Sequence, residues 1–217
     1  MKVNNKKYKY LFFDLDNTLW DFESNAVETL KEIYNKYHLE KYFEDFNTLV
    51  SSYWLTKNNL SQCLDQNITG VDSENLIKNI LADFDILLLK KTTLMPNTID
   101  ILNYLNIKYE MFIITNGNHN DQLRKLESSQ LLPYFKKIYT SERIGSKKPH
   151  KLFFEYAIKS SNAKKTNSLV IGDGWNSDIK GAASFGIDSI YINNNTIEAN
   201  TSSVKSISNL KELQHLL

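Results

Sequence analysis

The residues best suited to chemistry are two carboxylates, spaced two apart, near the start of the chain. Asp14 and Asp16 follow the apolar run Leu11–Phe13, and Thr18 comes two residues later. Because side chains alternate along a strand, residues two apart project from the same side. Adjacent carboxylates repel unless a divalent cation or a shared proton compensates, so the pair indicates a phosphoryl-transfer site. The alternative is a helix start capped by Asp16, Asn17 or Thr18.

A second group of polar residues follows the next long apolar run. Met111–Ile114 leads directly into Thr115, Asn116 and Gly117. A hydroxyl and free loop amides at such a strand end can bind phosphoryl oxygens. Asn-Gly is also a strong turn dipeptide, so taken alone this segment is interpreted as a turn.

Two later segments add a cation and two more carboxylates. Lys148 precedes Pro149 at a predicted helix start, where a lysine can neutralise phosphate charge. The run Leu169–Ile171 leads into a turn that contains Asp173 and Asp178, which would supply oxygen ligands for Mg²⁺. The alternatives are a solvated surface lysine pair and, for the aspartates, a helix cap.

Short strand-like runs alternate with helical patterns in most of the chain, which predicts an α/β fold with a parallel sheet. The predicted strands are 11–13, 111–114, 138–139, 169–171, 190–192 and 204–207. The predicted helices that accompany them are 97–105, 121–130, 152–161, 177–185 and 209–217.

From about residue 22 to residue 92 there is no strand pattern, only amphipathic helical spacing. We therefore predict a core domain of residues 1–20 and 93–217 and an inserted helical cap domain of residues 21–92. Helices are expected over 43–57 and from residue 73 to residue 87, and an earlier one has Asn25 and Glu28 placed as a capping box. The insertion follows the first strand's carboxylates, at the end of the sheet where α/β ligands bind.

Composition excludes some classes of partner. With 41% hydrophobic and 12% aromatic residues the chain has enough apolar content for a core, and its net charge of +1 favours neither a nucleic acid polymer nor a membrane surface. The single cysteine, Cys63, cannot form an internal disulfide, and the first residues lack the apolar segment of an export signal. A cytoplasmic protein is expected, as a monomer or homodimer.

Taken in order, the segments DLDNT, TNG, KKP and GDGWNSD resemble the four motifs of the haloacid dehalogenase superfamily. The resemblance spans residues 10 to about 193. It implies a doubly wound, Rossmann-like parallel sheet with strand order 5-4-1-2-3, and a helical cap inserted after the first motif.

The same resemblance implies an enzyme that uses Mg²⁺. Asp14 is implied as the nucleophile that forms an aspartyl-phosphate, and Asp16 as the general acid that then becomes the base. Asp14, the backbone carbonyl of Asp16 and Asp173 are implied as metal ligands, with Asp178 as a further or alternate ligand.

The remaining motif positions are implied to bind the phosphoryl group. Thr115, Asn116 and Gly117 would hold its oxygens, while Lys148 offsets the charge of the transition state. The chain departs from the family pattern at Gly174, where the family usually has serine. That departure removes a side-chain hydrogen bond from the expected site and leaves Asp173 in place.

The resemblance favours a small phosphomonoester as substrate, because dehalogenating members lack the second aspartate of the first motif. The extended first motif is similar to that of bacterial pyrimidine 5′-nucleotidases, which favours a nucleoside 5′-monophosphate. Trp20, Phe22 and Trp54 could then stack on a base, although each is more often part of a helix-bundle core. The alternatives are a sugar-phosphate phosphatase, a phosphomutase resembling β-phosphoglucomutase, and a binding module without turnover.

Overall fold

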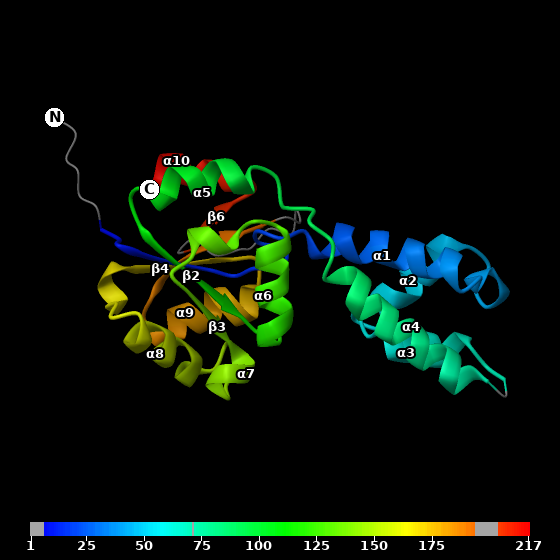
Figure 1. Cartoon of the computed structure of the whole chain (residues 1–217). Coiled ribbons are helices and arrows are strands. Elements are labelled where there is room, and N and C mark those ends of the chain that lie inside the picture. Colours follow the sequence, from blue (N-terminus) through cyan, green and yellow to red (C-terminus); the bar gives the residue numbers. More distant parts are fainter. Residues whose placement is uncertain (1–6, 71, 194–203) are drawn as a thin grey trace. The chain divides into compact units, whose positions relative to one another are not determined.

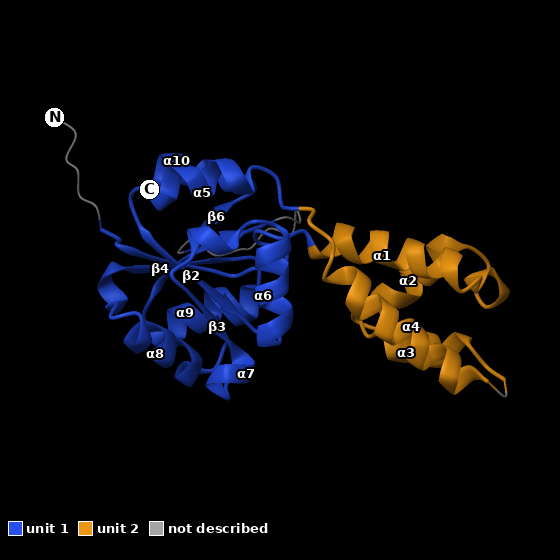
Figure 2. Ribbon diagram, in the orientation of Figure 1, with its two compact units in different colours: residues 1–21, 94–217 blue, residues 22–93 orange. Residues whose placement is uncertain are grey.

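A computed structural model describes residues 7–70, 72–193 and 204–217 and divides the chain into two compact units. Unit 1 consists of residues 1–21 and 94–217, and unit 2 of residues 22–93 (Figure 2). The division expected from the sequence lies one residue earlier at each junction.

Unit 1 is built on a six-stranded sheet in which every neighbouring pair of strands is parallel (Figure 1). The strand order is β3-β2-β1-β4-β5-β6, which confirms the predicted order 5-4-1-2-3 and adds β6 beside β5. The strands are β1 (Tyr10–Phe13), β2 (Glu110–Thr115), β3 (Lys137–Thr140), β4 (Ser168–Gly172), β5 (Asp188–Ile192) and β6 (Lys205–Ile207).

Helices lie on both sides of this sheet, with α5 and α10 on one side and α8 and α9 on the other (Figure 1). The helices of unit 1 are α5 (Thr98–Asn106), α6 (His119–Ser128), α7 (Ser141–Ile144), α8 (Lys151–Ser160), α9 (Lys180–Phe185) and α10 (Leu213–Leu216). Short 3-10 helices cover Leu132–Tyr134, Lys165–Asn167 and Leu210–Glu212. This two-sided cover explains why the central strands read as unbroken apolar runs.

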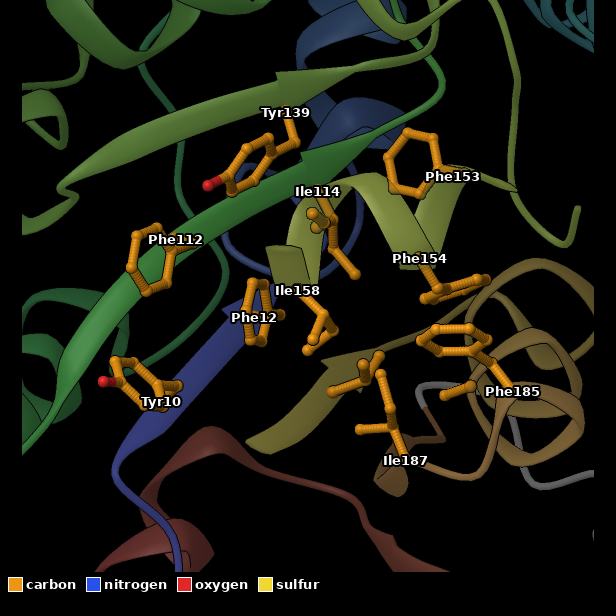
Figure 3. Close-up of a cluster of buried hydrophobic side chains, with 13 residues drawn as sticks. Tyr10, Phe12, Phe112, Ile114, Tyr139, Phe153, Phe154, Ile158, Phe185 and Ile187 are labelled. Atoms are coloured by element: carbon orange, nitrogen blue, oxygen red, sulfur yellow. The ribbon is translucent and has the colours of Figure 1, made fainter. Parts of the chain in front are cut away.

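The core between the sheet and α8 and α9 is rich in aromatic side chains (Figure 3). Phe12 of β1 stacks on Phe112 of β2 with ring centroids 5.1 Å apart, and Phe154 of α8 stacks on Phe185 of α9 at 6.3 Å. Burying an aromatic side chain of this size contributes roughly 2 kcal/mol or more, so this layer fixes the strands that carry the site.

Helices α6 and α9 of unit 1 begin differently from the sequence prediction. Helix α6 starts two residues earlier than expected, because the Asn118 side chain accepts hydrogen bonds from the N–H groups of Asn120 and Asp121. The predicted helix 177–185 is a π-helical turn, Trp175–Ile179, followed by α9. Its widened turn follows Gly174, whose carbonyl accepts from both Asp178 and Ile179.

Unit 2 contains four α-helices and no strand among its described residues, as the periodic apolar spacing predicted. They are α1 (Phe22–Lys36), α2 (Phe46–Leu55), α3 (Leu60–Asn67) and α4 (Ser73–Leu88), with a 3-10 turn at Leu39–Lys41. Helix α3 was not predicted from the sequence. It has only eight residues, and its clearest signal is Asn59, whose side chain accepts from the Gln62 N–H as an N-cap.

The predicted capping box at Asn25 is wrong. Helix α1 begins at Phe22, so Asn25 lies within it. Its side chain instead donates to the Thr93 carbonyl (2.9 Å) and accepts from the Thr93 N–H (3.2 Å). Asn25 therefore ties the first helix of unit 2 to the segment that leaves the unit, a contact that local spacing cannot reveal.

None of the helices among the described residues is long and apolar enough to span a bilayer. The polar segment 193–203, for which the sequence predicts a loop, lies outside the described residues except for Asn193.

Candidate active site

The site forms at the carboxyl ends of β1, β2 and β4, which are adjacent in the sheet. Phe13 is in register with Ile113 on one side and Ile171 on the other. The Asp14 N–H donates to the Ile171 carbonyl at 2.9 Å and so continues the strand pairing by one step. Residues that follow these three strands therefore meet at one edge of the sheet.

Lys148 lies at the centre of the site with its ammonium group buried. Its Nζ donates to Asp14 Oδ1 (2.8 Å), to Asp178 Oδ1 (2.6 Å) and to the Ile114 carbonyl (2.9 Å), which uses all three of its hydrogens. Burial by itself lowers the pKa of Lys148, but the two carboxylates outweigh it and raise the pKa above its usual range. The lysine therefore keeps its positive charge.

Asn116 holds the lysine loop in place. Its Nδ2 donates to the Lys148 carbonyl (3.0 Å), while its Oδ1 accepts from the Lys148 N–H (2.7 Å). This two-point contact joins the loop after β2 to the loop before α8. The Asn116 side chain is thus committed to the loop, and phosphate binding by its backbone N–H stays a prediction.

Three carboxylates gather beside Lys148. Asp14, Asp173 and Asp178 each offer an oxygen, and these oxygens lie within 4.8 Å of one another. Burial, followed by repulsion from Asp178, raises the pKa of Asp14 well above its ordinary range against the opposing effect of Lys148. The same two causes raise the pKa of Asp173 to about 6. One ammonium group, that of Lys148, therefore lies beside three carboxylates.

Hydroxyl and amide groups orient two of these carboxylates. The Thr18 hydroxyl donates to Asp173 Oδ1 at 3.1 Å and accepts from the Asp173 N–H at 3.1 Å. Asp178 Oδ2 accepts from the Gly174 N–H (3.1 Å) and from the Ser177 hydroxyl (3.2 Å). Each carboxylate therefore has a fixed direction before any ligand binds.

The contacts of Ser177 explain why position 174 is glycine, where the family usually has serine. A Cβ placed on Gly174 would lie 2.0 Å from the Ser177 Oγ and 2.5 Å from Asp178 Oδ2. The space that a side chain at position 174 would take is thus filled by the Ser177 hydroxyl. Ser177 donates to Asp178 in this chain, and glycine at 174 makes room for it.

Asp16 has different neighbours from the three clustered carboxylates. Its Oδ1 accepts from Lys125 Nζ at 2.6 Å, and its Oδ2 accepts from Gln122 Nε2 at 3.1 Å. Both partners come from α6 and are buried. Sequence analysis did not identify Gln122 or Lys125. The available signal was their spacing of three on the helix after Gly117, which places them on one face.

Thr115, the last residue of β2, contacts Gln122 and Gly117 at the same edge of the sheet. Its hydroxyl donates to Gln122 Oε1 (3.0 Å) and accepts from the Gly117 N–H (3.1 Å). A Cβ on Gly117 would lie 2.5 Å from Gln122 Nε2, so glycine is needed for the helix side chain to approach. The predicted residues Asp14, Thr115, Lys148, Asp173 and Asp178 are therefore brought to one edge, with Asp16 beside Thr115 through Gln122.

The three aromatic residues suggested as stacking surfaces have different surroundings. Trp20 has no exposed surface, and Lys125 Nζ lies 4.4 Å from its ring centroid, so a base could not reach it here. Phe22 and Trp54 belong to unit 2 and are half-buried. Trp54 packs on Tyr53 with ring centroids 4.8 Å apart. A substrate role for Phe22 and Trp54 stays a prediction.

Comparison with known proteins gives consistent matches over nearly the whole chain. The sequence profile of haloacid dehalogenase-like hydrolases matches residues 11–192. The HAD-hydrolase YfnB of Bacillus subtilis is 26% identical, over 98% of this chain and 96% of YfnB. A crystal structure of YfnB bound to magnesium superposes with a TM-score of 0.77 at 25% identity, covering 97% of this chain and 99% of that one.

Two further relatives are named for their substrates. The pyrimidine 5′-nucleotidase YjjG of Escherichia coli is 27% identical, over 97% of this chain and 98% of YjjG. The glyceraldehyde 3-phosphate phosphatase of Methanothermobacter thermautotrophicus is 26% identical, over 94% of this chain and 99% of that enzyme.

Proposed function

The chain belongs to the family of haloacid dehalogenase-like hydrolases and is a phosphatase of that superfamily, and we propose that it is a Mg²⁺-dependent phosphomonoesterase acting through a phosphoryl group on Asp14. The observation that carries this proposal is the contact of Asp14 with Lys148, beside two more carboxylates that follow β4, Asp173 and the buried Asp178.

The carboxylate group fits a divalent cation. Asp14, Asp173 and Asp178 bring hard oxygen atoms within 4.8 Å of one another, and Mg²⁺ prefers a few carboxylates together with water and phosphate. Lys148 supplies a single positive charge against three carboxylates, so a cation is needed for all three to be ionised at once. When bound there, Mg²⁺ would neutralise charge on the phosphoryl group and orient it.

Asp14 is suited to act as the nucleophile. One of its oxygens is held by Lys148, which leaves the other to attack phosphorus. The new bond joins that oxygen to phosphorus as the bond to the leaving alkoxide breaks. Lys148 cannot take part as a base, because its three hydrogens are all donated and its charge is held by two carboxylates. It stabilises the negative charge that develops in transfer.

Asp16 is suited to handle protons. In the first step it would give a proton to the leaving oxygen, and the alcohol departs. In the second step it would take a proton from water as the water attacks the phosphoryl group on Asp14, which releases inorganic phosphate and restores both carboxyl groups. Thr115 and the loop amides at Asn116 and Gly117 would hold phosphoryl oxygens through both steps.

Nucleoside 5′-monophosphates are the proposed substrates. The extended first motif and the similarity to the nucleotidase YjjG support this choice. The similarity to a glyceraldehyde 3-phosphate phosphatase, at nearly the same identity, favours a small sugar phosphate as the second candidate. Both candidates share the chemistry at Asp14 and differ only in the part of the substrate beyond the phosphate.

The test is phosphate release from a panel of nucleoside monophosphates, sugar phosphates and an aryl phosphate, with Mg²⁺ and with EDTA. We expect Mg²⁺-dependent hydrolysis with pyrimidine monophosphates preferred, and no turnover by Asp14→Asn. Preference for sugar phosphates would reject the nucleotidase proposal and keep the phosphatase chemistry. Appreciable hydrolysis by a folded Asp14→Asn variant would reject the covalent mechanism.

A further inference from the structure

Gln122 bridges two residues to which the proposed mechanism gives different tasks. Its Oε1 accepts from the Thr115 hydroxyl at 3.0 Å, and its Nε2 donates to Asp16 Oδ2 at 3.1 Å. Resting on the proposed function above, we propose that Gln122 is a positioning residue that couples phosphoryl binding at Thr115 to the placement of Asp16. It lies on α6, outside the four sequence motifs.

The directions of these hydrogen bonds are fixed by chemistry. Asp16 Oδ2 accepts from the amide nitrogen of Gln122, so that nitrogen faces Asp16. The amide oxygen then faces Thr115, and the single hydroxyl hydrogen of Thr115 must point to Gln122. The Gly117 N–H donates to the same hydroxyl oxygen at 3.1 Å, which leaves the hydroxyl no other hydrogen to offer.

A phosphoryl group would compete for that hydrogen. Phosphoryl oxygens accept hydrogen bonds, so Thr115 can donate to one of them only by releasing Gln122. Gln122 then keeps its bond to Asp16 Oδ2 as its remaining side-chain contact with the site, so its amide can follow that oxygen. Lys125 holds Asp16 Oδ1 at 2.6 Å, so the two side chains of α6 together place the Asp16 carboxyl group for the leaving group.

The packing around Gln122 leaves the bridge little freedom. Both Gln122 and Thr115 are 2% exposed, so their side chains are closed off from bulk solvent. The absence of a side chain on Gly117 opens the space through which Gln122 reaches them, because a Cβ there would lie 2.5 Å from Nε2. A buried polar side chain with both ends bonded has a defined position, and losing one end changes that position.

The test compares Gln122→Met, which keeps the length of the side chain but neither hydrogen bond, with Arg124→Met, an exposed position on the same helix. Substrates are an alkyl phosphomonoester and p-nitrophenyl phosphate, whose leaving group needs little protonation. We expect Gln122→Met to lower kcat at least about tenfold on the alkyl ester and less than about threefold on the aryl ester. Arg124→Met should match the wild type.

Inhibition by inorganic phosphate gives a second readout. In Gln122→Met the Thr115 hydroxyl no longer has Gln122 as a competing acceptor, so phosphate should inhibit at least as strongly as in the wild type. General damage to the site would weaken that inhibition. When Gln122→Met is added to an Asp16→Asn variant, it should not change the ratio of the rates on the alkyl and aryl esters. The side chain at position 16, which Gln122 places, no longer donates a proton in that variant.

Equal losses on both esters, or weaker inhibition by phosphate, would overturn the role of Gln122 while leaving the phosphatase intact. A wild-type protein inactive on every phosphomonoester would overturn the proposed function and this inference together. Thermal unfolding establishes that each variant is folded. Should Gln122→Met not fold, Gln122→Glu keeps the shape and the acceptor for Thr115 but has no amide donor for Asp16, and the same selective loss is expected.

Discussion

The clustered carboxylates should make this fold lose stability as pH rises when no divalent cation is present. Burial and the nearby Asp178 raise the pKa of Asp173 from 3.8 to about 6. The unfolded chain therefore loses this proton near pH 4 and the folded chain near pH 6. Between those values unfolding releases a proton, so a rise in pH favours the unfolded state.

The size of the effect follows from the difference in pKa. About two pH units correspond to about 3 kcal/mol of unfolding free energy, an upper limit for one group. Asp173→Asn removes the titration and keeps an oxygen that can accept from Thr18. Relative to the wild type in EDTA, this variant should therefore gain up to about 3 kcal/mol as pH rises from 4 to 7.

Urea unfolding at several pH values measures this difference, with EDTA and then with Mg²⁺. Mg²⁺ should restore stability to the wild type at pH 7, since a ligand that binds only the folded state stabilises it, and should act less on Asp173→Asn. Parallel curves of unfolding free energy against pH for the two proteins, or equal stabilisation by Mg²⁺, would refute the reasoning about this group.

Three further substitutions test separate parts of the site. Asp16→Asn should slow alkyl phosphates more than aryl phosphates in steady-state assays, and equal slowing would remove the acid role. Lys148→Met takes the cation from the carboxylates of Asp14 and Asp178. Urea unfolding at pH 7 in EDTA should show that the free energy of unfolding falls by about 3–5 kcal/mol. A fall below about 1 kcal/mol would contradict the ion pairs. Gly174→Ala should cost about 1–3 kcal/mol in thermal unfolding because its Cβ overlaps the Ser177 hydroxyl, and Ser177→Ala should recover part of that loss. A Gly174→Ala protein as stable as the wild type would show that this crowding is absent.

Sequence reasoning could predict the sheet and much of the site because both depend on local patterns. Unbroken apolar runs predicted the parallel strands, and five of them have the order that the family resemblance implied. In a parallel sheet the carboxyl ends of adjacent strands lie at one edge, so polar residues after each strand must meet there. Asp14, Thr115 and Asp173 follow β1, end β2 and follow β4, and could be grouped for that reason.

Other features depended on contacts between distant parts of the chain. Asn25 was predicted as a helix cap from its neighbours, but it pairs with Thr93, which is 68 residues away. The short helix α3 has too few periodic residues to stand out in the sequence. In the first case a hydrogen bond to a distant segment decides the outcome, and in the second the packing of a short helix against its neighbours.

The sequence by itself determined the fold class and the position of the four polar segments at strand ends, because alternation and turn residues act within a few positions, and the order of strands followed from the family resemblance. Only the tertiary structure decided the partners of each side chain. Lys125 meets Asp16 across 109 residues of sequence, and Gln122 joins that carboxylate to Thr115. Such pairings follow from how α6 packs against the end of the sheet, which depends on the shape of the whole core and on no single segment.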